Sequence, residues 1–130
     1  MKVALDIQVI SRYLANMPDE VGAVNKLDDI YLPYFVVAEL MAGYEGGIRA
    51  KESLQILKLF LARDGVNVLE APDASTRQLY ARIYGQLKKA GKMISITDIW
   101  IASECILAGV ELFSNDKDMD NIAQLLRYRA

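Results

Sequence analysis

Apolar residues change their spacing several times along the chain, and each change predicts a new element of secondary structure. Short apolar runs are typical of buried strands, whereas apolar residues three and four positions apart are typical of helices. We expect strands at 3–5, 30–32, 66–69 and 110–113. Helical spacing covers 9–14, 20–27, 35–41, 48–63, 79–90, 98–108 and 118–126, of which 48–63 is expected to be the longest helix.

Polar residues and glycines mark where these helices begin and end. Residues 75–78 have the form of a capping box ahead of the fifth helix, and Thr97 is expected to cap the sixth. Gly43, Gly65 and Gly109 are expected to close the helices that precede them. These signals set the predicted helix boundaries.

Strands that alternate with helices favour right-handed crossovers and a mostly parallel sheet. The predicted fold class is therefore α/β, with a central sheet of four or five strands flanked by helices. Apolar residues make up 53% of the 130 positions, enough for one ordinary core. Because no repeat or linker interrupts the pattern, we expect residues 1–130 to form a single domain.

The chain contains no histidine, and this limits the chemistry that it can perform. Ser-His-Asp and Cys-His catalysis, histidine general bases and zinc sites built on imidazole are excluded. Catalysis must use carboxylates, hydroxyls, lysines or a metal held by oxygen. The net charge of −2 argues against a protein that binds nucleic acid through phosphate contacts alone.

The sequence also indicates where the protein is found. A single cysteine excludes an intrachain disulfide framework, and Asp6, Gln8 and Arg12 interrupt the N-terminal apolar run before a signal peptide could form. No stretch reaches the roughly 18 uncharged apolar residues that a membrane helix needs. We therefore expect a cytoplasmic protein with no membrane partner.

Four acidic residues follow strands or open helices. Asp6 comes directly after the first strand, and Asp116 follows the last. Glu39 lies on the short helix after the second strand, and Asp98 opens a helix behind Thr97. Because ligands bind beyond the carboxyl ends of parallel strands, we expect these four carboxylates to meet at one edge of the sheet.

Clustered carboxylates repel one another, and a divalent cation would supply the missing counter-charge. Mg²⁺ and Mn²⁺ prefer oxygen ligands and bridge readily to phosphate oxygens. Each acid also has a simpler interpretation: Asp6 and Asp116 as turn or cap residues, and Asp98 as a complement to a helix dipole. Glu39 is the most informative, because an unpaired carboxylate buried in the apolar segment 35–42 would cost several kcal/mol.

Four motifs in order give the chain its resemblance to a known family. They are Leu5-Asp6, Ala38-Glu39-Leu40 with Gly43, Thr97-Asp98-Ile99-Trp100-Ile101-Ala102, and Ser114-Asn115-Asp116-Lys117-Asp118. Together they resemble a PIN domain, and specifically the VapC-type toxin ribonucleases of toxin–antitoxin pairs. The resemblance spans essentially the whole chain, and the segment beginning at Asp98 is its strongest part.

The resemblance implies a Mg²⁺- or Mn²⁺-dependent endoribonuclease that hydrolyses RNA phosphodiester bonds. Asp6, Glu39, Asp98 and Asp116 would bind the metal, and Ser114 would help to fix the site. Asp118 would be either an additional acid or the cap of its own helix. The resemblance further implies a homodimer and a cognate antitoxin that covers the acidic pocket.

One motif departs from the family pattern, in which the first aspartate is followed by a hydroxyl residue and an asparagine. Here Ile7 and Gln8 follow Asp6: Ile7 donates no hydroxyl hydrogen bond, whereas Gln8 would take the place of the asparagine beside the metal site, with its amide on a longer arm. The alternative hypothesis is therefore a catalytically weakened PIN-like binding module. An aspartate-based phosphatase fits poorly, because its nucleophile normally has a second aspartate two residues on.

Several other residues have structural and functional interpretations side by side. Cys105 is expected in the core. Trp100 and the pair Tyr80 and Tyr84 are interpreted as packing or interface residues rather than as base-stacking platforms. The basic residues near the end of the fifth helix either complement its dipole or contact an RNA backbone: Arg82, Lys88, Lys89 and Lys92.

Overall fold

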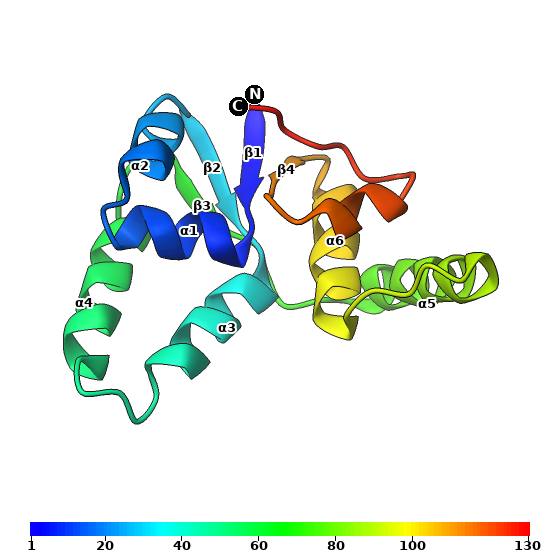
Figure 1. The fold of residues 1–130 in the computed structure, drawn as a ribbon, viewed down its shortest axis with the longest axis horizontal. Coiled ribbons are helices and arrows are strands. Elements are labelled where there is room, and N and C mark those ends of the chain that lie inside the picture. The colour runs from blue at the N-terminus through cyan, green and yellow to red at the C-terminus, as the bar shows by residue number, and fades with distance from the viewer.

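In the computed structural model, which describes residues 1–130, four strands alternate with six α-helices and one 3-10 helix (Figure 1). The strands are β1 (Lys2–Leu5), β2 (Asp29–Leu32), β3 (Val66–Val68) and β4 (Glu111–Phe113). The α-helices are α1 (Ile7–Leu14), α2 (Pro18–Val24), α3 (Tyr34–Tyr44), α4 (Ala50–Leu61), α5 (Ala74–Ala90) and α6 (Ile96–Ala108). The 3-10 helix η1 spans Lys117–Asn121.

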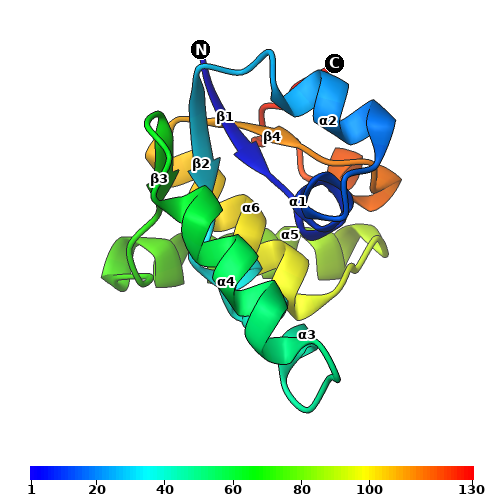
Figure 2. The same cartoon turned by 90° about the vertical axis from the view of Figure 1, so that its left-hand side faces the viewer.

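All four strands are parallel, in the order β3-β2-β1-β4. The chain adds β2 and β3 on one side of β1 and then returns to place β4 on the other side. The strand order thus reverses at β1, and α/β sheets bind ligands at such a reversal. Helices α1, α2 and α4 lie on one side of the sheet and α5 and α6 on the other (Figures 1 and 2). The predicted α/β class with a parallel four-stranded sheet is confirmed.

The core contains 25 buried apolar residues, including the central residues of β1 and α6. Val3, Ala4 and Leu5 are fully buried because helices cover both faces of the sheet. Cys105 is also fully buried, which confirms that the cysteine is a core residue. No helix combines the length and apolar character needed to cross a bilayer.

Several helix boundaries differ from the prediction. Pro18 opens α2, because the first helical turn tolerates its missing N–H, so α2 covers Pro18–Val24 and not 20–27. Helix α3 continues through Gly43 to Tyr44, and the chain turns at Gly46, which has a φ of 73°. Helix α4 is shorter than the predicted 48–63, and the 17 residues of α5 make it the longest helix.

Two predicted caps are replaced by nearby residues. Asp73, not Ser75, caps α5, and its carboxylate accepts hydrogen bonds from the backbone N–H and the hydroxyl of Thr76. Ser95, not Thr97, caps α6 and accepts from the backbone N–H of Asp98 at 3.2 Å. Both helices therefore begin two residues before the position that the sequence signals suggested. Gly109 ends α6 in the left-handed conformation, as predicted.

The predicted C-terminal helix at 118–126 is wrong. Only the short 3-10 helix η1 forms there, and buried Met119, Ile122 and Leu125 recur every three residues, which is the period of a 3-10 helix. The following segment lies beside β4, where the backbone N–H of Leu112 donates to Leu126 O at 2.8 Å. Pairing of this tail with the sheet therefore replaces the last turns of the predicted helix.

Gly65 provides a test of the connection between α4 and β3. Its φ is 81°, and a Cβ atom there would lie 2.4 Å from the carbonyl oxygen of Asp28. We expect Gly65→Ala to lower the free energy of unfolding by about 1–3 kcal/mol in urea denaturation. Gly22→Ala in α2, where the added methyl meets nothing within 4 Å, should raise it by about 0.5–1 kcal/mol. Equal urea midpoints for Gly65→Ala and the wild type would contradict this account of the turn.

Candidate active site

Asp6 lies at the carboxyl end of β1, where the strand order reverses. Only 4% of the residue is exposed, and its backbone N–H donates to Phe113 O of β4 at 3.0 Å. One carboxylate oxygen, Oδ1, accepts from the backbone N–H of Ile7 at 2.8 Å and so caps α1. The helix cap that the sequence suggested is thus present, and Oδ2 remains directed toward β4.

The loop after β4 brings a second group of polar side chains to Asp6. The Ser114 hydroxyl donates to Oδ2 of Asp6 at 2.5 Å and accepts from the backbone N–H of Asp116 at 3.1 Å. The Asp116 carboxylate in turn accepts from the backbone N–H of Asp118 at 2.9 Å and caps η1. Ser114 therefore connects the buried aspartate after β1 to the half-exposed Asp116 of the loop.

Glu39 and Asp98 reach the same edge of the sheet from two helices. Burial raises the pKa of Glu39, and the negative charges of Asp98 and Asp6 raise it further. Burial also raises the pKa of Asp98; Ser95 opposes this shift, whereas the charges of Asp6, Asp116 and Asp118 add to it. The structure thus brings the four acids into one electrostatic cluster, together with Asp118.

No basic side chain pairs with this cluster. The only ion pairs in the chain are Arg12–Glu20, Arg127–Asp120 and Arg129–Asp120, and none involves an acid of the cluster. Carboxylates such as Glu39 and Asp98, whose pKa values are raised by burial and by neighbouring negative charges and which have no cationic partner, form an electrostatic environment that favours a bound cation.

The donor set consists of oxygen atoms alone, which suits Mg²⁺ or Mn²⁺. No three of the carboxylates stand close enough to ligate one ion together. Mg²⁺ usually binds one or two protein carboxylates and keeps several of its waters. Spaced carboxylates therefore suit Mg²⁺ better than they suit a metal whose ligands all come from the protein.

The unusual residues after Asp6 take no part in the cluster. Gln8 is exposed on the first turn of α1, and its amide forms no hydrogen bond with any of the acids. Ile7 is half-buried and packs against the core. The hydrogen bond that fixes Asp6 comes instead from Ser114.

Sequence reasoning missed two residues that hold the loop after β4 and the start of α6. The Arg127 side chain is 8% exposed; its Nη2 donates to Ser114 O at 2.8 Å, and its Nη1 pairs with Asp120 at 2.7 Å. Ser95 places the N-terminus of α6, and with it Asp98. A serine three residues before an aspartate is a recognisable cap signal, but nothing local marks Arg127.

Aromatic residues from three helices stack beside the site. The Trp100 ring stacks on Tyr80 with 4.2 Å between centroids and on Phe35 with 5.5 Å. Tyr84 continues the column, 6.1 Å from Tyr80. Trp100 therefore packs within the chain, between α3 and α5. The basic residues at the end of α5 are exposed: Arg82, Lys88, Lys89 and Lys92.

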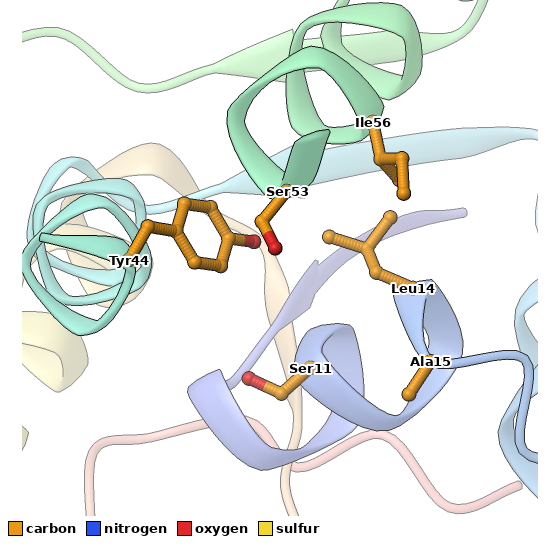
Figure 3. Close-up of a pocket in the computed structure, with 6 residues that line it drawn as sticks. All are labelled: Ser11, Leu14, Ala15, Tyr44, Ser53 and Ile56. Carbon is orange, nitrogen blue, oxygen red and sulfur yellow. The ribbon is translucent and has the colours of Figure 1, made fainter. Parts of the chain in front are cut away.

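Two neighbouring hollows of the surface lie away from the acids, between α1 and α4. One, of about 190 Å³, is lined by Ser11, Leu14, Ala15, Tyr44, Ser53 and Ile56 (Figure 3). The second, of about 510 Å³, shares Leu14 and Ile56 and extends to Leu59 and Phe60. Because Ile56 is 41% and Leu59 64% exposed, these hollows form an apolar groove, which we call the α1–α4 groove.

The architecture agrees with comparisons to known proteins. A family model described as the PIN domain matches residues 3–125. The chain belongs to the PIN domain family. Ribonuclease VapC1 of Haemophilus influenzae strain R2866 is 29% identical over 126 residues, which are 93% of this PIN domain and 92% of that protein. The homologue of strain KW20 is 28% identical over the same lengths.

Solved structures show the same fold. The toxin–antitoxin complex VapBC-1 from nontypeable Haemophilus influenzae aligns with a TM-score of 0.84 at 25% identity, over 98% of this PIN domain and 97% of that chain. VapBC2 from Rickettsia felis, bound to a DNA fragment of its promoter, aligns with a TM-score of 0.85 at 22% identity and covers 98% of both chains. The predicted resemblance to the PIN and VapC families is confirmed.

The burial of Asp98 and the negative charges around it predict how metal-free stability depends on pH. Because the pKa of Asp98 is raised in the folded state, folding favours its protonated form, and the resulting penalty grows as the pH rises through the folded-state pKa. Asp98→Asn removes that charge. We expect the variant to melt about 2–4 °C above the wild type at pH 7.5 in metal-free buffer, with the difference vanishing toward pH 4.

The matched control is Asp64→Asn, which removes an exposed acid from the turn between α4 and β3. It should leave the melting temperature unchanged at both pH values. A lower melting temperature for Asp98→Asn at pH 7.5 would show that Asp98 stabilises the metal-free fold and is not repelled by its neighbours.

Proposed function

We propose that this PIN domain is a Mg²⁺- or Mn²⁺-dependent endoribonuclease and the toxin of a VapBC-type toxin–antitoxin pair. The observation that carries the proposal is the cluster of carboxylates from four segments at the strand-order reversal, in which the pKa values of Glu39 and Asp98 are raised and no acid has a basic partner. The relatives named ribonucleases cover nearly the whole chain and support the RNA phosphodiester bond as its target.

Asp6, Glu39, Asp98 and Asp116 would hold the metal, in part through water. The bound ion would polarise the phosphodiester and lower the pKa of the attacking water. Ser114 keeps Oδ2 of Asp6 in a fixed orientation, and the backbone N–H of Asp116 fixes Ser114 in turn. Asp118 adds negative charge at the rim of the site, in addition to its position at the start of η1.

The raised pKa values of Glu39 and Asp98 affect how the site would bind a metal ion. Protonated carboxylic acids are poor ligands, so metal binding would displace protons from these two side chains. We therefore expect activity to fall as the pH falls, because Glu39 and Asp98 take up protons and release the ion.

The substrate would be single-stranded or looped RNA, whose bases and phosphates a protein can reach. Arg82 and the three exposed lysines at the end of α5 are the candidates for contacts to its backbone. The catalytically weakened binding module is not favoured. All four acids are present, and the site does not rely on the unusual Gln8, because Ser114 fixes Asp6.

Cleavage of a mixed pool of structured RNAs tests the proposal. With Mn²⁺ the wild type should cut the pool, and excess EDTA should abolish cutting. Asp98→Asn should slow cleavage by about 100-fold or more, because the loss of a metal ligand removes several kcal/mol of transition-state stabilisation. The control, Asp64→Asn, removes an exposed acid far from the cluster and should cut at the wild-type rate.

Equal cutting by the wild type and Asp98→Asn would exclude Asp98 from the catalytic site and indicate a contaminating nuclease. Absence of any cutting by the wild type, despite bound Mn²⁺, would favour the binding-module alternative.

The partner would be an antitoxin, since the solved structures that resemble this chain include VapBC complexes and a toxin–antitoxin complex from Klebsiella pneumoniae. We propose that an apolar segment of the antitoxin occupies the α1–α4 groove, where large apolar side chains are left uncovered. The homodimer also remains a proposal, with Tyr80 and Tyr84 of α5 as candidate interface residues.

Leu59 tests the antitoxin proposal. Leu59→Lys places a charge in the α1–α4 groove, and we expect it to prevent co-purification of a co-expressed antitoxin while leaving the fold intact. Leu107→Lys is the matched control, because Leu107 is also exposed, at 49%, but lies on α6. Loss of the antitoxin with Leu107→Lys, but not with Leu59→Lys, would place the partner elsewhere.

A further inference from the structure

Glu104 is a buried carboxylate that the acidic site does not include. It lies on α6, and only 6% of the residue is exposed. Its Oε2 accepts from the backbone N–H of Tyr34 at 2.7 Å, and its Oε1 accepts from that of Phe35 at 3.4 Å. These N–H groups are the first two of α3, so the side chain of one helix caps the start of another.

Helix α3 has no side-chain cap of its own. Pro33 occupies the N-cap position and offers no side-chain acceptor. The first N–H groups of a helix have no partner within that helix, and leaving them unpaired in a buried place is costly. Glu104 therefore supplies from α6 the acceptor that the local sequence lacks.

The two helices joined by Glu104 carry two of the four acids. Glu39 lies five residues after Tyr34 on α3, a distance of about 7.5 Å along the helix axis. Asp98 lies six residues before Glu104 on α6, a distance of about 9 Å along that axis. An anchor at Glu104 therefore brings Glu39 to nearly the level of Asp98. The charge of Asp98 does act on Glu39, and stacking of Phe35 on Trp100 is a second link between the helices.

We propose that Glu104 is a positioning residue of the acidic site, which fixes the start of α3 against α6 and thereby holds Glu39 opposite Asp98. Its relevance to catalysis rests on the proposed function, whereas its role in the geometry does not. Glu104 itself binds no metal in this proposal, because its carboxylate is already committed to α3.

The surroundings of Glu104 contain no cation. No lysine or arginine nitrogen lies within 4.0 Å of its carboxylate, and the titratable groups nearby are acidic or neutral: Glu70 and Asp73 line the same hollow, and Cys105 follows it on α6. Burial raises the pKa of Glu104 to about 7, and the N–H groups of Tyr34 and Phe35 oppose the shift. The cap is thus fully charged only above neutral pH.

Three proteins test the proposal: Glu104→Ala removes the acceptor, Glu104→Gln keeps one acceptor oxygen without charge, and Glu20→Ala is the control. Glu20 is similarly buried but pairs with Arg12, on the far side of the sheet from α6. Calorimetric titration with Mn²⁺ alone should show affinity about 10-fold lower for Glu104→Ala, most of which Glu104→Gln restores. Glu20→Ala should bind Mn²⁺ as the wild type does.

A second measurement does not depend on metal or on activity. Trp100 is the only tryptophan and stacks on Phe35 of α3, so its emission reports the placement of α3 against α6. We expect the wild-type emission to change between about pH 6 and 8, and the change to be absent from Glu104→Gln. Hydrogen exchange at the backbone N–H groups of Tyr34 and Phe35 should be faster in Glu104→Ala.

The two measurements distinguish a failure of the proposed function from a failure of the proposed role of Glu104. If the wild type binds no Mn²⁺, the proposed function fails, and emission and exchange still decide whether Glu104 holds α3. The proposal would be overturned if Glu104→Ala had the same Trp100 emission, the same hydrogen exchange at Tyr34 and Phe35 and the same Mn²⁺ affinity as the wild type. If Glu104→Ala does not fold, the pH dependence of Trp100 emission in the wild type and in Glu104→Gln tests the proposal. An identical pH profile in these two proteins would overturn the proposal.

Discussion

The hydrogen bond from Ser114 to Asp6 joins the ends of the two strands between which the order of the sheet reverses, and the acidic site depends on it. Asp6 is buried at the end of β1, and a buried carboxylate without partners would be costly. Its two oxygens are satisfied separately, by the start of α1 and by Ser114. The same serine fixes Asp116, so one hydroxyl aligns a buried and a half-exposed acid.

The rest of the site is built from helix starts. Ser95 places the beginning of α6 and thus Asp98, and Glu104 places the beginning of α3 and thus the helix of Glu39. Such caps leave the acids on rigid elements while their charges still repel one another. The metal-free protein therefore carries an electrostatic penalty that a cation would relieve, which is a trade of stability for function.

Sequence patterns predicted the strands and the gathering of the four acids at one edge of the sheet, because a parallel sheet brings the ends of its strands to one edge whatever the loops do. They predicted the structure less well where it depends on a contact between residues far apart in the sequence. Glu104 looks like an ordinary polar residue of a helix until α3 packs against it, and the pairing of the C-terminal tail with β4 abolished a helix that local spacing favoured. Arg127 was missed for the same reason, since its partners lie 7 and 13 residues away.

The central claim is that four carboxylates from separate segments act together as one cation site. Calorimetric titration of Mn²⁺ into the metal-free wild type and into Asp6→Asn, Glu39→Gln, Asp98→Asn and Asp116→Asn tests it most directly. The account predicts saturable binding by the wild type and a loss of affinity of about 10-fold or more in every variant. Wild-type affinity in all four variants would contradict it.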